Sequence, residues 1–491
     1  MKNNKTILAL LLVFVLLVSC VACSEPDTPS GNESKEASEA VSTEAPDESK
    51  AEESSEVTPL AKNLGEREIK FLVAGSTYGN YESFEIFAEE TNEEAINDAV
   101  FERNQLVQQK LNCIITEEKS SNVAADMDTY VQGGINDYAV YMPMINDAVN
   151  YVGSGDMLDL HEFDDVMHLS EGWWDQKANE GLEINGKLFF TTGDISILDN
   201  ECTMVVLFNK KLIEKYNLES PYDLVDNKLW TMDKIYEMGK DFTENLGDSV
   251  WNDEDHYGLH VAFNAPHSFF FGCGGTITEK TSDGKLAINM NSEKNVTILD
   301  KVFEISYKPD VVTNKTPNCS TWEDICRMFL NDQIIFTTLA LTDLKSFRSV
   351  DGFEYGILPY PLLTPEQEEY HCLISTGLVP GVCIPSNIEA PEDVALVLDN
   401  MAYYSQDTVT KAYYQVTLKS RDLKDDASER MLDIIFNSRV YDMGYIYNFG
   451  GLGKLIETMN SKNSSDFTSN YQAIADKAQR ELEETLENFD Y

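Results

Sequence analysis

The stretch EIKFLVAG, residues 68–75, decides the fold together with INDAVFERNQLVQQKL, residues 96–111. The first segment is apolar and β-branched and stops at a glycine, which predicts a buried strand that ends in a loop. The second repeats apolar residues at helical spacing and predicts an amphipathic helix. A second short strand is expected at 113–116, and a strand, a helix and a strand in this order imply a parallel sheet. The core-facing side of the helix is expected to carry Ala99, Leu106, Val107 and Leu111.

Strands and helices keep alternating along the chain, which predicts an α/β fold with two sheets. The body from residue 66 to residue 491 is too long for one simple core and suggests two or more lobes. Strands are expected at 138–142, 205–209, 334–339 and 353–361, and helices at 210–216, 231–241, 322–330, 390–404 and through most of the C-terminal region.

The N-terminus resembles a bacterial lipoprotein signal. Lys2 and Lys5 precede an apolar run at 7–18, which is short for a membrane span and typical of a signal peptide. Cys20 follows small and aliphatic residues, as in a lipobox, with Cys23 as the alternative. The resemblance implies cleavage before a cysteine and a lipid on its sulfur. An ordinary secretory signal is the competing interpretation.

A linker is expected between this signal peptide, residues 1–23, and the body. Residues 24–65 are rich in Ser, Glu, Ala, Asp, Pro and Thr and contain no aromatic residue. Such a segment cannot bury enough apolar surface to offset its chain entropy, so it is predicted to be disordered. It would hold the body away from a membrane surface.

The formal net charge of −48 argues against binding to nucleic acid or to an anionic membrane, and it is compatible with a cationic ligand. The seven cysteines of the body form no CxxC pair, so a zinc ribbon is not expected. Cys319 and Cys326 are spaced so that they could bridge in an oxidising compartment.

Several short blocks resemble the extracellular solute-binding proteins of ABC importers, family 1, which includes the maltose-binding type. Each block is short, and their order and spacing along the body carry the resemblance. Asp332 stands where the family usually has a glycine. The blocks are INDA at 96–99, GDMLDL at 155–160, GWWD at 172–175, FNKKL at 208–212, LWTMD at 229–233, YGL at 257–259, FLNDQ at 329–333 and YGILPYP at 355–361.

This resemblance implies a two-lobe periplasmic-binding-protein-like fold of type II, with a hinge and a ligand cleft between the lobes. Lobe 1 is expected at 66–200 plus 353–405, and lobe 2 at 201–352 plus 406–491. The chain would cross between them near 196–204, 350–357 and 404–410. The implied protein is a monomer without catalytic residues, cofactor or metal. It would be lipid-anchored at the extracellular face of the membrane and deliver a carbohydrate to an ABC permease.

A carbohydrate site is expected to pair aromatic rings with polar side chains, because sugars present polar edges and an apolar C–H face. The adjacent Trp173 and Trp174 are local candidates, with core packing as the alternative for both. Asp194 and Tyr78 follow predicted strands, at positions where open α/β sheets bind ligands. The full candidate set is Tyr78, Trp173, Trp174, Asp194, Asn264, Phe271, Trp322 and Tyr447.

Other functions stay open. A surface glycoside hydrolase needs a pair of carboxylates that only the fold can bring together. A receptor for a peptide or a polyamine would suit the acidic body. His256 and His260 lack further ligands for zinc, and the acidic loop 245–255 lacks the residue order of an EF-hand calcium loop.

Overall fold

The computed structural model describes residues 57–247, 250–261, 264–282, 284–308, 310–311, 316–319, 321–347, 350, 352–418 and 426–489. The predicted signal peptide, Cys20, Cys23 and most of the predicted linker therefore lie outside the described residues. Two larger sheets and two small two-stranded pairs are present in the part described.

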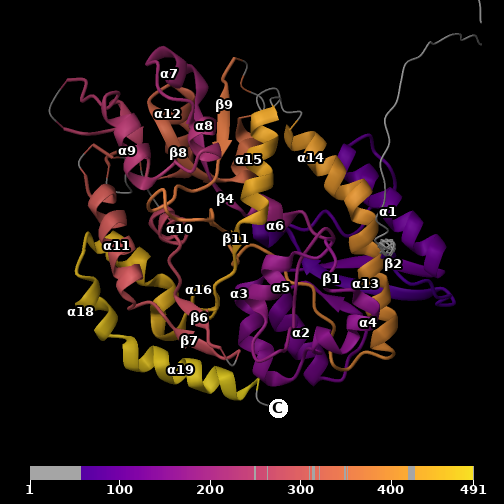
Figure 1. Cartoon of the computed structure of the whole chain (residues 1–491). Coiled ribbons are helices and arrows are strands. Elements are labelled where there is room, and N and C mark those ends of the chain that lie inside the picture. Colours follow the sequence, from indigo (N-terminus) through magenta and orange to yellow (C-terminus); the bar gives the residue numbers. More distant parts are fainter. Residues whose placement is uncertain are drawn as a thin grey trace, which may run out of the picture. The chain divides into compact units, whose positions relative to one another are not determined.

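The first sheet confirms the predicted strand, helix and strand. β1 (Arg67–Ala74) pairs in parallel with β2 (Cys113–Ser120) and with β3 (Val140–Tyr141), in the order β2-β1-β3. The connection between β1 and β2 runs through α1 (Ala95–Leu111), which packs beside α13 (Pro391–Ser405) (Figure 1).

One expectation for α1 is wrong, because Leu106 is 38% exposed. Val100, Val107 and Leu111 are buried and form the core-facing stripe of the helix. Leu106 lies about 100° around the helix axis from Val107, at the edge of this stripe, so its side chain reaches solvent.

The second sheet has the order β5-β8-β4-β9 and is mostly antiparallel. Its strands are β5 (Tyr257–Leu259), β8 (Ile334–Ala340), β4 (Met204–Asn209) and β9 (Tyr355–Leu358). Every residue of these strands is buried, which explains their unbroken apolar runs. β9 belongs to this sheet, although the predicted boundary at residue 353 assigns it to lobe 1. The remaining lobe boundaries stay a prediction.

The helices predicted at 210–216, 231–241, 322–330 and 390–404 are all present. Thr231 accepts a hydrogen bond from the backbone N–H of Lys234 and caps α9 (Met232–Lys240), as expected. A reciprocal pair of hydrogen bonds between Thr321 and Asp324 begins α12 (Trp322–Leu330). The other helices are α2 (Val123–Gln132), α3 (Ile145–Ala148), α4 (Asp164–Met167), α5 (Gln176–Leu182), α6 (Leu198–Glu201), α7 (Lys210–Lys215), α8 (Pro221–Asp226), α10 (Ala265–Gly272), α11 (Glu293–Ser306), α14 (Lys411–Leu418), α15 (Asp426–Asn437), α16 (Met443–Tyr447), α17 (Leu455–Lys462), α18 (Phe467–Gln472) and α19 (Ala475–Glu487).

The end of the predicted linker packs on the body, so the expectation of disorder is wrong for residues 57–65. Lys110 Nζ donates to the backbone oxygen of Pro59 (2.9 Å), and the N–H of Leu64 donates to the oxygen of Leu111 (2.7 Å). Pro59 is also buried and Leu64 packs against the core, so both residues help to hold the segment on the body.

The seven cysteines of the body are all free thiols, so Cys319 and Cys326 do not bridge. Within the described ranges, no helix is both long enough and apolar enough to cross a membrane.

A buried guanidinium connects segments that are far apart in the sequence. Arg439 begins β11 (Arg439–Val440), which pairs with β10 (Cys372–Leu373). Its side chain is 7% exposed, and its Nη1 lies 2.8 Å from Asp175 Oδ2 and 3.3 Å from Asp199 Oδ2. Its Nη2 donates to Asn200 Oδ1. Tyr441 also donates to Asp175 Oδ2 (3.0 Å), so the cluster is held by several hydrogen bonds.

We expect Arg439→Met to lower the free energy of unfolding by about 3 kcal/mol or more, because two buried carboxylates lose their cation. Urea denaturation of the variant and of the wild type measures this difference. Arg430→Met is the matched control, since Arg430 forms a half-exposed pair with Asp226 and should change stability by less than about 1 kcal/mol. Equal losses in the two variants would contradict a structural role for the Arg439 cluster.

Candidate functional site

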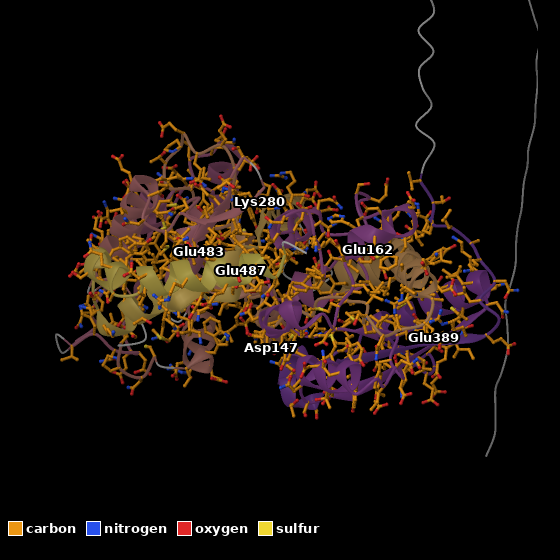
Figure 2. All side chains as sticks on the ribbon, turned by 90° about the horizontal axis from the view of Figure 1, so that it is seen from below. Asp147, Glu162, Lys280, Glu389, Glu483 and Glu487 are labelled. Atoms are coloured by element: carbon orange, nitrogen blue, oxygen red, sulfur yellow. The ribbon has the colours of Figure 1, made fainter. Side chains whose placement is uncertain are left out.

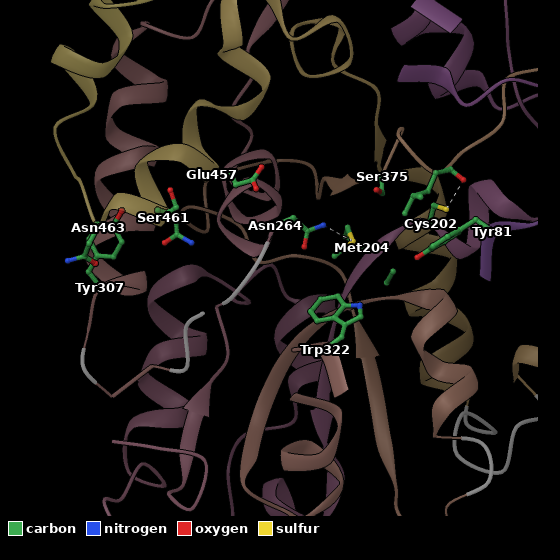
Figure 3. A pocket seen from close by; sticks show the side chains of 13 residues that line it. Tyr81, Cys202, Met204, Asn264, Tyr307, Trp322, Ser375, Glu457, Ser461 and Asn463 are labelled. Atoms are coloured by element: carbon green, nitrogen blue, oxygen red, sulfur yellow. Dashed lines mark hydrogen bonds between the residues drawn. The ribbon is translucent and has the colours of Figure 1, made fainter. Parts of the chain in front are cut away.

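A cavity of about 590 Å³ lies where elements of both sheets end (Figure 3). Tyr81 belongs to the 3₁₀ helix Ser76–Tyr81 that follows β1, Met204 begins β4, and Ala340 ends β8. Ser375 and Leu378 come from the segment after β10. The lining residues are Tyr81, Cys202, Met204, Asn264, Tyr307, Trp322, Ala340, Ser375, Leu378, Glu457, Asn460, Ser461 and Asn463.

Three aromatic side chains line the cavity. Tyr307 follows α11, and its hydroxyl hydrogen bonds to the backbone oxygens of Met459 (3.3 Å) and Ser464 (3.1 Å), which fixes the ring. Burial raises the pKa of Tyr307 to about 12 and also raises the pKa of Tyr81 above its usual value. Both phenols are therefore neutral donors at physiological pH. Trp322 is the first residue of α12.

The polar side of the cavity comes mainly from one helix. Glu457, Asn460 and Ser461 are spaced three and four residues apart on α17, so they share a face of the helix. Asn463 follows at the end of this helix with a φ of 54°, a conformation that asparagine adopts more readily than most residues.

From the opposite part of the lining, Asn264 Nδ2 lies 3.6 Å from Met204 Sδ, which is a weak acceptor. This contact is weaker than a hydrogen bond to oxygen. Rings beside amides and hydroxyls can bind a ligand that has an apolar face and a polar edge.

Two of the eight predicted site residues, Asn264 and Trp322, line this cavity. Trp173 and Trp174 are buried elsewhere: Trp173 Nε1 donates to Asp399 Oδ1 (2.8 Å), and Trp174 Nε1 donates to the backbone oxygen of Met167 (2.7 Å). Ligand contact by any of the eight stays a prediction.

Asp194 lines a separate recess of about 320 Å³, together with Trp173 and Trp174. Its Oδ1 accepts a hydrogen bond from Thr410 Oγ1 (2.9 Å). Burial raises the pKa of Asp194 to about 7, while the hydrogen bond from Thr410 and the charge of Arg439 act in the opposite direction.

The last three predicted residues do not line the large cavity either. Phe271 is fully buried in α10, where its ring packs on Tyr445 with centroids 5.9 Å apart. Tyr447 stacks on Phe449 at 5.2 Å, and Tyr78 is half-buried in the 3₁₀ helix after β1.

Most of the lining residues are not among the predicted site residues. Tyr81 could have been found, because it lies in the same post-strand segment as Tyr78. Glu457 and its neighbours on α17 carry no local signal, since nothing in the sequence shows that this helix meets the ends of the sheets.

His256 and His260 have separate partners. The ring of His256 stacks on Phe242 at 4.9 Å, and His260 Nδ1 lies 3.0 Å from Thr337 Oγ1. Over the described part of the chain, no three His, Cys, Asp or Glu side chains come together as a possible metal site.

No protein-family model and no curated protein sequence matches the chain. Solved structures do resemble it. UgpB from Mycobacterium tuberculosis, in complex with glycerophosphocholine, matches with a TM-score of 0.56 and 15% identity over 87% of this chain and 100% of that one. A cyclo/maltodextrin-binding protein with bound maltotetraose matches with a TM-score of 0.55 and 12% identity, covering 88% of this chain and 98% of that one. The GacH receptor of Streptomyces glaucescens matches with a TM-score of 0.51 and 12% identity, over 85% and 98% of the two chains.

The two sheets and these matches define a two-lobed α/β binding-protein fold. It is the type II periplasmic-binding-protein fold, in the form found in maltose-binding-like proteins.

We expect Asp194→Asn to change how stability depends on pH. The folded pKa of about 7 exceeds the ordinary aspartate value of about 3.9, so the folded protein keeps a proton that the unfolded chain releases. The stability from this group is complete below about pH 4 and is lost as pH rises through about 7. The Asn variant cannot titrate, so it should gain stability relative to the wild type between pH 5 and pH 8.

Urea midpoints at pH 5.0, 6.5 and 8.0 measure this effect. Asp433→Asn, at an exposed position on α15, serves as the control and should follow the wild-type profile. Parallel profiles for Asp194→Asn and the wild type would contradict a buried, proton-holding Asp194.

Proposed function

We propose that the protein is a solute-binding protein of family 1 of the ABC importers, anchored by lipid at the extracellular face of the membrane. It captures a small solute, most simply a carbohydrate or oligosaccharide, and delivers it to an ABC permease. The fold and the order of the sequence blocks support this proposal, as does the similarity to a cyclo/maltodextrin-binding protein in complex with maltotetraose.

The cavity is the observation that carries the proposal. Its volume of about 590 Å³ lies within the range of roughly 300–1,000 Å³ that is typical of small-molecule sites. Its lining combines Tyr81, Tyr307 and Trp322 with several amides and hydroxyls. Aromatic rings suit the C–H faces of sugars, and the polar groups suit their hydroxyls.

The proposed mechanism is hinge closure. In an open form, the ligand would meet one wall of the cavity, and closure would bring the second wall onto it. The ligand favours the closed form because only that form offers both sets of contacts. The permease would then recognise and bind the closed form.

A glycoside hydrolase is less well supported. Most such enzymes need two carboxylates across the scissile bond. Glu457 is the sole carboxylate among the described residues that line the cavity. A binding protein for a polyamine or a peptide remains the alternative within the binding class.

The first experiment is a thermal-shift screen of residues 57–491, which form one compact unit. Monosaccharides, disaccharides, oligosaccharides, spermidine and short peptides are the probes. A ligand that binds only the folded state raises the melting temperature, and at a concentration of 100 Kd it stabilises the protein by about 2.7 kcal/mol. We expect a shift with one class of glycan and no product by chromatography. Glycan turnover would instead indicate a hydrolase, and a shift with spermidine or peptides alone would replace the carbohydrate assignment.

Trp322→Ala should weaken binding of the sugar found in this screen by about tenfold or more, because a stacking surface is lost from the cavity. Isothermal titration calorimetry measures the affinity. Trp251→Ala is the matched control: Trp251 is half-buried beside Tyr257 and does not line the cavity. Equal affinities in the Trp322 variant and the wild type would place the sugar elsewhere.

The lipid anchor is tested in the full-length chain. We expect Cys20→Ala to move the protein from the membrane fraction to the soluble fraction, because the thioether cannot form. Cys23→Ala should leave it in the membrane fraction. The opposite result would assign the lipid to Cys23.

A further inference from the structure

Glu457 is exposed to solvent, like the other acidic residues labelled in the figures, but it differs from them because it lines the cavity. Glu162, Glu389, Glu483 and Glu487 are exposed on the outer surface (Figure 2). Glu457 lies in the first turn of α17 and lines the cavity (Figure 3). It therefore puts a negative charge beside any bound ligand.

The charge of Glu457 is not neutralised locally. It forms no ion pair with any Lys, Arg or His of the described residues. The other described lining residues are neutral: aromatic rings, amides, hydroxyls, a thiol and apolar side chains. A cation in the cavity would therefore lie near one carboxylate that has no ion-pair partner. None of the described lining residues is positively charged.

The aromatic lining favours a cation for an independent reason. The faces of Trp and Tyr rings attract ammonium groups, and the attraction grows when water is excluded. Tyr81, Tyr307 and Trp322 supply such rings around the same cavity. The net charge of −48 adds a long-range field that raises the concentration of cations near the protein.

We infer that the solute is a saccharide that carries a protonated amine, an amino sugar or a short oligomer of amino sugars, with the ammonium group paired to Glu457. This inference rests on the proposed function and narrows the class of its ligand. The rings cover the C–H faces of the sugar, the amides and hydroxyls contact its hydroxyl groups, and Glu457 selects the amine.

The test compares two disaccharides that differ at one kind of group. The β-1,4-linked glucosamine dimer carries ammonium groups at pH 6.0 where cellobiose carries hydroxyls. Isothermal titration calorimetry of residues 57–491 should show the glucosamine dimer binding about tenfold or more tightly than cellobiose. The N-acetylated dimer, in which each amine has become a neutral amide, should lose this advantage.

Glu457→Gln should remove the preference. We expect its affinity for the glucosamine dimer to fall about tenfold and its affinity for cellobiose to stay within about twofold. Glu487→Gln removes one surface charge at the end of α19, outside the cavity lining, and should leave both affinities unchanged. This control separates the ion pair between Glu457 and the ligand from the effect of the protein's net charge. An unchanged melting temperature of the ligand-free variants checks that they fold.

The possible results separate the two proposals. Tight binding of cellobiose or another neutral sugar, unaffected by Glu457→Gln, would overturn the amine inference and leave the proposed function intact. Binding of spermidine with no sugar bound would overturn the amine-saccharide inference and the carbohydrate part of the proposed function, and it would keep the solute-binding role. A glucosamine preference that Glu457→Gln and Glu487→Gln reduce equally would also overturn the inference, because it would assign the effect to net charge alone.

Discussion

The ion cluster of Arg439 is the constraint on which the arrangement of the site depends. Its guanidinium binds Asp175 at the start of α5 and reaches Asp199 and Asn200 just before β4. It also sits on β11, whose partner β10 leads into Ser375 and Leu378 of the cavity. A buried charge without partners is strongly unfavourable. The start of α5, the residues before β4 and β11 are therefore held next to one another. The segment that carries Ser375 and Leu378 is thus anchored next to this cluster, through β10.

The fold could be predicted because its signals are local and strong. β1, α1 and β2 each bury one face or both. A half-buried strand has apolar residues at every second position, an amphipathic helix has them at a spacing of 3.6 residues, and a fully buried strand has an unbroken apolar run. The same holds for β4, β8 and the helices capped by Thr231 and Thr321. The assignment of β9 shows the limit of this reasoning. Its sequence predicts a strand correctly, but only the pairing with β4 reveals the sheet to which it belongs.

The site was harder to predict, since it forms from residues that meet only in space. Tyr81, Tyr307 and Glu457 lie more than a hundred residues apart from one another in the sequence, and none of them belongs to a recognisable sequence motif. Trp173 and Trp174 show the opposite problem. Their local sequence attracts attention, yet each indole N–H is satisfied inside the body, by Asp399 and by the backbone of Met167. Both indoles thus have the core packing that was the alternative expectation, and their contact with a ligand stays a prediction.

Under the proposed hinge closure, contacts outside the predicted crossings would bias the balance between the open and closed forms. At the end of the chain, Phe489 packs on Phe189 with centroids 5.5 Å apart, and Lys280 Nζ lies 3.6 Å from Glu183. Under the predicted lobe boundaries, both contacts join lobe 2 to lobe 1. An aromatic pair contributes about 1 kcal/mol beyond its buried area, and a part-exposed ion pair contributes less. A ligand must bind one form about 5.5 kcal/mol better than the other to move a two-state balance from 1:99 to 99:1. These two contacts alone are too weak to lock the lobes against such a ligand. The buried ion pairs of Arg439 with Asp175 and Asp199 also join the predicted lobes, and they add to the bias of the ligand-free balance. Selectivity would then rest on the cavity lining, where a ligand that satisfies both walls gains the remaining free energy.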